Sequence, residues 1–456
     1  MKRILSVLLL TAMLTACGTG TATTTLDAVS DDANTADVSV SGDEEADPEP
    51  DYSNFVFPEE TDTLVVYSSD MLLQTMNPAI KIFEEMYPHI NVDYQILTDS
   101  EQQDRLRVEI PAGAGPDLVF SYGIDLPDIY KTMATGVFCD LNPYLYNDEE
   151  FSFDDYITGT FTGSMMQGKQ YIVPIQVRMP IVLTTMGILE ENGISTESLD
   201  TYDGFLDACT IFKQNNPDSG IFDYGADEAY LSDLYENCGL NLINYANNTI
   251  TMDKDAMNKF ADVCKLYYNQ KAQDPMAGDT MNSFTERKFI FQTYNTSSFL
   301  LINDICGVRG TLKDIPYATL VPDPYDGATA YMMTFAAIPN GSQNKLNAYR
   351  LLKILLSEEI QYGAHATLGM PVHCESFRKN YDSNVDQYIE WGFDDVIRDD
   401  VTILIEKCFS VTRTFASPSI LRRYLKLEIT PYLTGKRTFD ECYDNLYTTI
   451  ELYKDE

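Results

Sequence analysis

The chain has 456 residues, of which 70 are Asp or Glu and 31 are Lys or Arg, so its net charge is −39 at pH 7. A chain this acidic is a poor partner for nucleic acid, and we attribute the charge to solubility. Its three histidines, His89, His365 and His373, leave little material for a His-rich metal site or a catalytic triad, and its length predicts two domains.

The first residues have the pattern of an export signal. Two basic residues precede an apolar run at residues 4–14, which is shorter than the roughly 20 residues that span a bilayer. The run ends in Leu-Thr-Ala-Cys, whose last residue is Cys17, and this resembles the lipobox of bacterial lipoproteins. We therefore expect a signal peptide at 1–16, lipidation of Cys17 and a location at the extracytoplasmic face of the bacterial cell membrane. An ordinary secretory signal with a chance cysteine is the alternative.

A second segment, residues 17–62, has the composition of a disordered tether. Between Gly18 and Asp62 there are thirteen Asp and Glu residues and no Lys or Arg. Such a segment cannot bury enough apolar surface to offset its chain entropy, and its charges repel one another. We expect it to connect the lipid anchor to a folded body that begins near residue 63.

The eight cysteines after Cys17 show neither a Cys-x-x-Cys pair nor a regular spacing, so they do not indicate a zinc site. An exported chain can form disulfides, and buried free thiols are equally compatible with the sequence. The residues are Cys139, Cys209, Cys238, Cys264, Cys306, Cys374, Cys408 and Cys442.

From residue 64 onward, short apolar runs alternate with amphipathic stretches, which is typical of βαβ units. The pattern predicts strands at 64–67, 90–94 and 118–120 and helices at 76–87 and 126–135. Pro88 and Gly136 end the two helices. The chain therefore belongs to the α/β class.

Several short motifs follow one another in a recognisable order. They are Phe83–Val92, Gly115–Val119, Gly136–Tyr144, Gly168–Pro174, Gly187–Ile194, Thr201–Phe205, Pro322–Pro324, a strand at 335–338 and a helix at 345–357. In this order they resemble the extracellular solute-binding proteins of the sugar-type ABC family, over residues 63–456. Two features depart from that family: Thr185-Met186 stands where Tyr-Asn is usual, and Trp391 is the single tryptophan.

The resemblance implies a two-lobed, periplasmic-binding-protein-like fold of type II, with mainly parallel sheets flanked by helices and a ligand cleft between the lobes. By the same resemblance, residues 63–175 and 322–363 form lobe one, and residues 176–321 and 364–456 form lobe two. The first crossing between the lobes is expected near Pro174–Gln176.

In open α/β sheets, ligands bind beyond the carboxyl ends of the strands. This rule selects polar side chains after the first and third strands and at the hinge, and the resemblance adds a ligand-facing turn. The candidates are Ser69, Asp70, Ser121, Tyr122, Asp125, Gln176, Arg178, Tyr294 and Asn295. Tyrosine rings stack on sugar faces, and amide, carboxyl and guanidinium groups bind hydroxyls.

Four of these candidates have a structural alternative. The two tyrosines could be ordinary packing residues, and Asp70 could cap a helix. Arg178 could form a structural salt bridge, or, as a hinge cation, it could favour an acidic sugar.

The sequence holds no phosphate-binding Gly-x-x-x-x-Gly-Lys motif, and we expect neither a cofactor nor a catalytic or metal-binding residue. The resemblance implies a monomer that captures a small solute, most simply a carbohydrate, by lobe closure and delivers it to the membrane subunits of an ABC importer. A sensor or surface-binding lipoprotein without an importer, and an anchored glycoside hydrolase, remain as alternatives.

Overall fold

The computed structural model describes residues 52–123, 125–126, 128–223, 234–236, 238–268, 280–294, 298–363 and 369–456. The chain divides into two units, Met1–Asp51 and Tyr52–Glu456, and the described residues all belong to the second. The predicted signal peptide, Cys17 and most of the predicted tether therefore lie outside the described residues.

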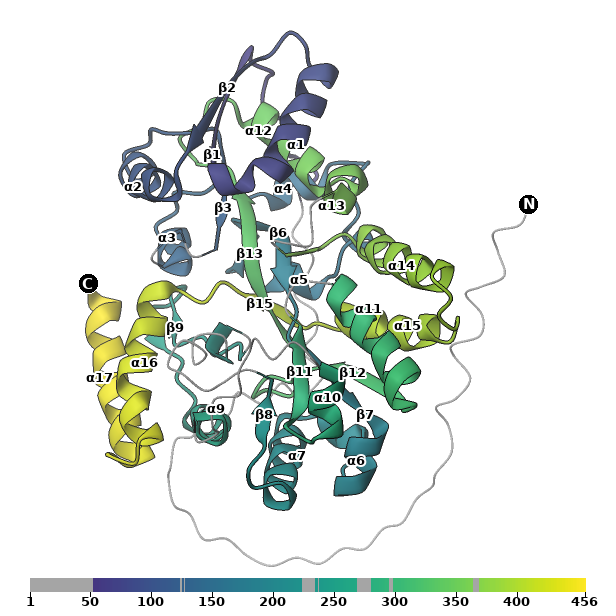
Figure 1. Cartoon of the computed structure of the whole chain (residues 1–456). Helices are drawn as coiled ribbons and strands as arrows, with labels where there is room; N and C mark the ends of the chain where they lie inside the picture. The colour runs from purple at the N-terminus through teal and green to yellow at the C-terminus, as the bar shows by residue number, and fades with distance from the viewer. Residues whose placement is uncertain are drawn as a thin grey trace, which may run out of the picture. The chain divides into compact units, whose positions relative to one another are not determined.

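Seven strands form the larger sheet, in the order β14-β6-β13-β3-β1-β2, with β15 beside β13 (Figure 1). They are β1 (Thr63–Ser69), β2 (Asn91–Leu97), β3 (Leu118–Tyr122), β6 (Val173–Arg178), β13 (Thr329–Ala337), β14 (Met370–Pro371) and β15 (Arg413–Phe415). Strand β1 pairs in parallel with β2 and β3, whereas β13 runs antiparallel to β3 and β6. All nine residues of β13 are buried, as expected for a central strand that is covered on both faces.

Four strands form a smaller sheet, in the order β12-β7-β11-β8. They are β7 (Ile181–Thr185), β8 (Gly220–Phe222), β11 (Phe289–Tyr294) and β12 (Pro316–Leu320). Two short hairpins accompany the sheets: β4 (Met165–Met166) with β5 (Lys169–Gln170), and β9 (Ile243–Asn244) with β10 (Thr249–Ile250). The first strand of the smaller sheet, β7, follows β6 of the larger sheet after only two residues, Met179 and Pro180.

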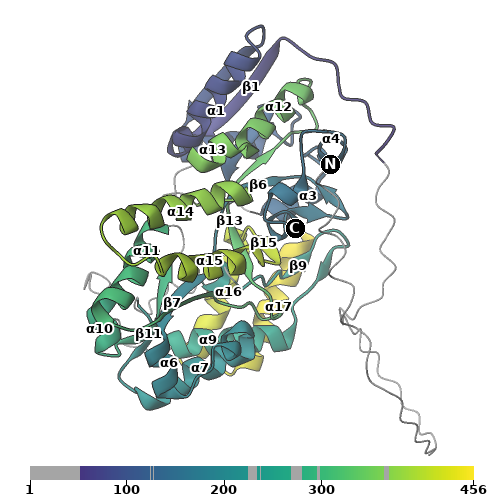
Figure 2. The same ribbon diagram turned by 90° about the vertical axis from the view of Figure 1, so that its right-hand side faces the viewer.

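Helices flank both sheets, which confirms the predicted α/β class. Figure 1 and Figure 2 show α1, α12 and α13 side by side next to β1, and α16 and α17 together at the C-terminus. The α-helices are α1 (Leu73–Met86), α2 (Asp99–Glu109), α3 (Ile129–Ala134), α4 (Asn142–Tyr146), α5 (Gly159–Thr162), α6 (Met186–Asn192), α7 (Tyr202–Asn215), α9 (Lys254–Tyr268), α10 (Thr280–Thr285), α11 (Ser298–Gly307), α12 (Lys345–Leu356), α13 (Glu358–Gly363), α14 (Cys374–Glu390), α15 (Ile397–Phe409), α16 (Ser419–Leu433) and α17 (Phe439–Asp455). Shorter helical turns are η1 (Asp70–Leu72), η2 (Phe153–Asp155), η3 (Glu197–Asp200) and η5 (Val308–Leu312).

Most of the elements predicted from periodicity are present. The strands predicted at 64–67, 90–94 and 118–120 are β1, β2 and β3, and the predicted helices at 76–87 and 126–135 are α1 and α3. The predicted strand at 335–338 is the end of β13, and the helix predicted at 345–357 is α12.

Asp117, in the predicted motif before β3, ties three segments together. Its carboxylate accepts hydrogen bonds from the backbone N–H of Val65 at 2.7 Å, the hydroxyl of Ser342 at 2.7 Å and the amide of Asn344 at 2.8 Å. The motif is thus explained by the junction between β1, β3 and the start of α12, and not by ligand binding.

Residues 52–62, which the sequence analysis assigned to the tether, pack against the folded body. The ring of Phe55 lies 4.8 Å from that of Tyr144, and the ring of Phe57 lies 6.0 Å from that of Tyr349. The average composition of the tether is acidic, but its aromatic residues are concentrated in this last part, and they provide the apolar surface that the rest lacks.

Two short strands from the C-terminal part of the chain join the larger sheet. Strand β14 pairs with β6, and β15 pairs in parallel with β13. Both strands lie within 364–456, the segment that was assigned to lobe two.

The eight cysteines after Cys17 are free thiols; Cys374 is half-buried and the other seven are buried. The fold is therefore built without a cross-link among them. Within the described part of the chain, no helix is both long enough and apolar enough to cross a membrane.

Candidate functional site

The pairing of β13 with its neighbours brings the ends of β3 and β6 together. Tyr122, the last residue of β3, lies opposite Thr334, and Arg178, the last residue of β6, lies opposite Tyr331. Since β13 runs antiparallel to both strands, its early residues lie beside their carboxyl ends. The expectation that ligands bind beyond the carboxyl ends of strands therefore points to one region of the larger sheet as the candidate site.

Tyr122 is the residue of this region on which several charged side chains act. Its pKa is raised to about 12, first by burial of the half-buried phenol and then by the negative charges of Asp99 and Asp125, while the charge of Arg178 opposes the shift. The charge of Asp70 also acts on this hydroxyl. Four charged side chains from different parts of the chain therefore lie within electrostatic reach of one tyrosine.

Asp125 closes the turn after β3. Its carboxylate accepts hydrogen bonds from the hydroxyl of Ser121 at 2.5 Å, the backbone N–H of Tyr122 at 3.0 Å and the amide of Gln103 at 3.1 Å. Burial raises the pKa of Asp125 despite these donors. Ser121 and Asp125 thus shape the loop that holds Tyr122, and their polar atoms are largely engaged.

Ser69 ends β1 and Asp70 follows it, and the two side chains have different surroundings. The buried Ser69 hydroxyl accepts a hydrogen bond from the backbone N–H of Met71 at 3.1 Å and donates one to Asp99. The cap that we considered for Asp70 is therefore made by Ser69, whereas Asp70 is exposed in the first turn of η1.

Gln176 and Arg178 stand two residues apart on β6. Gln176 is fully buried; its carbonyl oxygen accepts a hydrogen bond from the Thr334 hydroxyl at 3.3 Å, while its amide nitrogen is buried with no partner among the described residues. The Nε of Arg178 is likewise buried with no partner there, and the guanidinium lies 5.9 Å from the ring centre of Tyr331. Two buried donors are thus free at this strand end.

Tyr294 belongs to the smaller sheet, where it lies opposite Ile181 on β7. The side chain is buried, and its hydroxyl donates a hydrogen bond to Asp304. Burial and the charge of Asp304 raise its pKa well above the usual value. The hydroxyl is engaged in the fold, as the packing alternative anticipated, and Asn295 lies outside the described residues.

The sequence analysis missed Tyr331 and Asp99. Burial raises the pKa of Tyr331, and the charges of Glu236, Arg422, Arg178 and Asp125 all act on its hydroxyl. Finding Tyr331 would have required the direction of β13, because a residue near the start of a strand meets the carboxyl ends of its neighbours only when the strands are antiparallel.

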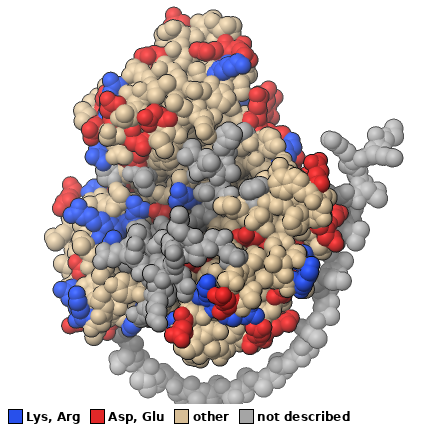
Figure 3. Space-filling view, in the orientation of Figure 1, with Lys and Arg blue, Asp and Glu red and all other residues tan. Residues whose placement is uncertain are grey.

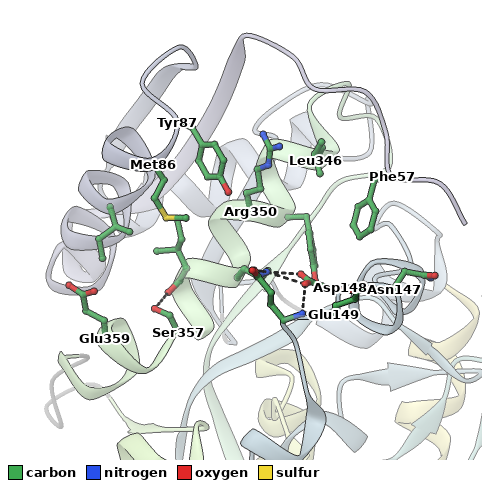
Figure 4. A pocket seen from close by; sticks show the side chains of 15 residues that line it. Phe57, Met86, Tyr87, Asn147, Asp148, Glu149, Leu346, Arg350, Ser357 and Glu359 are labelled. Carbon is green, nitrogen blue, oxygen red and sulfur yellow. Dashed lines mark hydrogen bonds and ion pairs between the residues drawn. The ribbon is translucent and has the colours of Figure 1, made fainter.

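A groove elsewhere beside the larger sheet is separate from the residues around Tyr122 and Arg178. A groove of about 650 Å³ lies between α1, α12 and the loop at 147–150, and Figure 4 shows Tyr87 and Arg350 in its lining. None of the candidate residues lines it. Figure 3 shows that the face seen in Figure 1 is hollowed at mid-height. Among the described residues, no group of three or more His, Cys, Asp or Glu side chains could hold a metal ion.

Comparison with protein families gives one match, in which residues 78–376 fit the model of the bacterial extracellular solute-binding proteins. The chain belongs to this family. A search of curated proteins gives no match.

Among solved structures, the sugar-binding protein MalE of Xanthomonas citri shares 14% identity, covers 86% of this chain and 97% of its own, and has a TM-score of 0.63. The cyclic alpha-maltosyl-1,6-maltose binding protein of Arthrobacter globiformis shares 14% identity over 87% of this chain and 99% of its own, with a TM-score of 0.56. The GacH receptor of Streptomyces glaucescens shares 14% identity over 87% and 100%, with a TM-score of 0.51. At this identity the likeness concerns the fold, and it confirms the expected type II periplasmic-binding-protein fold.

Proposed function

We propose that this solute-binding protein captures a carbohydrate and delivers it to an ABC importer. The observation that carries the proposal is the cluster at the ends of β3 and β6, where tyrosine rings lie among carboxylates and a guanidinium. Sugars need apolar faces for stacking and paired polar groups for their hydroxyls, and this cluster offers both. The names of MalE and of the Arthrobacter protein, which describe sugar ligands, support this choice of ligand.

We assign the ligand to the boundary between two lobes. The larger sheet would form lobe one and the smaller sheet lobe two, with the first crossing at Met179–Pro180 between β6 and β7. Lobe one would then run from residue 63 to 178, and the remaining boundaries keep the sequence assignment, with 322–363 in lobe one, except that β14 and β15 go with the larger sheet. Tyr122 and Arg178 would then contact a ligand from the lobe-one side.

Capture needs no covalent step. A ligand that bridges the lobes binds the closed state better than the open one and shifts the hinge equilibrium toward closure. The membrane subunits of the importer would then bind the closed form, and the protein itself would work as a non-enzymatic monomer.

Cys17 would carry the lipid anchor at the extracytoplasmic face of the membrane. Two acyl chains, each adding about 0.8 kcal/mol per buried CH₂, are enough for stable attachment. The Cys17→Ser protein should move from the membrane to the soluble fraction, and an unchanged distribution would refute the anchor.

Thermal unfolding tests the ligand class. The purified protein is screened against neutral sugars, acidic sugars, oligosaccharides, amino acids and peptides. A ligand at 100 times its Kd stabilises the native state by about 2.7 kcal/mol, which raises the unfolding midpoint by a few degrees.

The sugar is then recovered from the protein, and its molecular mass is measured to show whether it has been cleaved. A sugar series that raises the midpoint and is recovered unchanged supports the proposal. If no small solute raises it, the sensor alternative replaces the importer, and if the sugar is recovered cleaved, the hydrolase does.

A further inference from the structure

Among the residues that the structure describes, Arg178 has no acidic partner. No ion pair and no hydrogen bond joins its guanidinium to any described residue, and its Nε is buried. Burying a charged group without a partner is costly, so natural proteins place such a group where something else completes it.

The other arginines show that this state is exceptional in the chain. Every other arginine of the described residues that is at least partly buried forms an ion pair with a carboxylate. The pairs are Arg105–Glu109, Arg287–Glu191, Arg309–Asp400, Arg350–Glu60, Arg378–Glu406, Arg398–Asp386, Arg413–Asp323 and Arg422–Glu236. With 70 acidic residues in the sequence, a carboxylate for Arg178 would be easy to supply.

Gln176 provides a second, independent observation. Residues two apart on a strand point to the same face, so the amide nitrogen of Gln176 and the Nε of Arg178 lie on one face of β6. Both are buried donors without an acceptor among the described residues. A ligand group that carries more than one oxygen atom could accept hydrogen bonds from both donors at once.

The charged side chains that act on Tyr122 lie on two sides of β13. Asp99, the first residue of α2, and Asp125, in the turn after β3, supply carboxylates that act on Tyr122, whereas Arg178 ends β6 on the other side of β13. Hydroxyls of a sugar suit the carboxylate side, and an anionic group suits the arginine side. The guanidinium of Arg178 also lies 5.9 Å from the ring centre of Tyr331, within the range of a cation–π contact.

We infer that the ligand is a saccharide that carries a carboxylate, as a uronate does, and that Arg178 binds this carboxylate with the help of the Gln176 amide. The inference rests on the proposed function and narrows its ligand class. Arginine matches a carboxylate with two parallel N–H donors, which a neutral sugar cannot use in the same way.

The test uses uronate oligosaccharides, each paired with its carboxyl-reduced neutral counterpart, and measures binding to the purified full chain by calorimetry. The uronate should bind more tightly than its counterpart. Arg178→Gln should weaken uronate binding by about 30-fold or more and weaken binding of the neutral compound much less. Arg178→Lys, which keeps the charge but not the two-donor geometry, should fall between.

Two controls separate binding from folding and from net charge. Arg107→Gln removes one positive charge from an exposed site on α2 and should bind like the unaltered protein. Without ligand, Arg178→Gln should not lower the unfolding midpoint, because it breaks no ion pair with a described residue and removes a buried charge.

Equal binding of uronate and neutral counterpart, or unchanged uronate binding by Arg178→Gln, overturns the inference while the carbohydrate proposal stands. Binding of sulfated saccharides in place of uronates overturns the carboxylate assignment. If no saccharide of either kind binds, the proposed function fails, and the inference fails with it.

Discussion

Asp223, the residue after β8, has a carboxyl group that burial brings into the physiological pH range. Its oxygens accept hydrogen bonds from the backbone N–H of Thr293 at 3.1 Å, the Thr293 hydroxyl at 2.8 Å and the Gln292 amide at 2.5 Å. These donors favour the ionised form, but burial outweighs them and raises the pKa of Asp223 to about 6.

A raised carboxyl pKa means that the native state binds the proton more tightly than the unfolded state. The resulting stability is present below the unfolded pKa, which is about 3.9, and is lost as the pH rises through about 6. The loss amounts to about 3 kcal/mol for a shift of this size. Asp223→Asn should remove this pH dependence and be more stable than the unaltered protein at pH 7.

Urea unfolding at several pH values between 4 and 8 measures the difference. The two free energies of unfolding should diverge as the pH rises through 6. An exposed control, Asp104→Asn on α2, should follow the unaltered protein throughout. Parallel curves for Asp223→Asn would contradict the role of burial.

At the scale of single residues, the sequence predicted which side chains lie at strand ends, but not which hydrogen-bond or ion-pair partners they have. The strand-end rule selected Tyr122 and Arg178 because it depends only on where strands stop. It also selected Ser121 and Asp125, whose polar atoms are engaged with each other. Which donors and acceptors remain free is a property of the packed structure, and so the unpartnered state of Arg178 could not be read from the sequence.

At the scale of elements, apolar periodicity predicted the strands and helices that bury one clear face. It failed for α2, in which Gln102 and Leu106 are the only buried residues. That helix is defined at its start, where Thr98 and Glu101 form a capping box with hydrogen bonds of 3.3 and 3.0 Å. The capping signal was present in the sequence, but without an apolar face it was not recognised.

The turn between β12 and β13 is organised by Asp323, which is fully buried. Its carboxylate accepts hydrogen bonds from the backbone N–H groups of Tyr325 at 2.9 Å and Gly327 at 3.2 Å and from the Thr329 hydroxyl at 2.7 Å. Arg413 of β15 lies 3.5 Å away. One side chain therefore fixes both the turn and the start of β13, the strand that carries Tyr331.

Asp323→Ala should lower the free energy of unfolding by about 3 kcal/mol, because it leaves several buried donors without an acceptor. The midpoint of urea unfolding at pH 7 gives the value. Asp104→Ala, at an exposed position of α2, should change it by less than about 0.5 kcal/mol. A loss at Asp323 no larger than that of the control would show that the turn does not depend on the carboxylate.

At the scale of the whole folded unit, few connections join the two sheets. Residues 179–180 link β6 to β7, and residues 321–328 link β12 to β13. Short connections of this kind can act as hinges, because a few residues absorb the change in backbone angles while the sheets move as rigid bodies. The proposed closure around a ligand would therefore be a change between the sheets and not within them.

Paired fluorescent labels can distinguish movement of the two sheets relative to each other from a change within one sheet. Lys81→Cys on α1 and Glu190→Cys on α6 place exposed labels beside the larger and the smaller sheet. Cys374→Ser removes the half-buried thiol, and the other seven cysteines of the described residues are buried. A saturating ligand should raise the energy transfer between this pair, because closure brings the sheets together.

The matched control places both labels beside the larger sheet, at Lys81→Cys and Asp104→Cys, and its energy transfer should stay constant. Single-molecule histograms should show two fixed positions whose populations change with ligand concentration, since a ligand redistributes states that already exist. If ligand binding is saturated and neither pair responds, capture occurs without closure, and the hinge mechanism is wrong even though the ligand assignment holds.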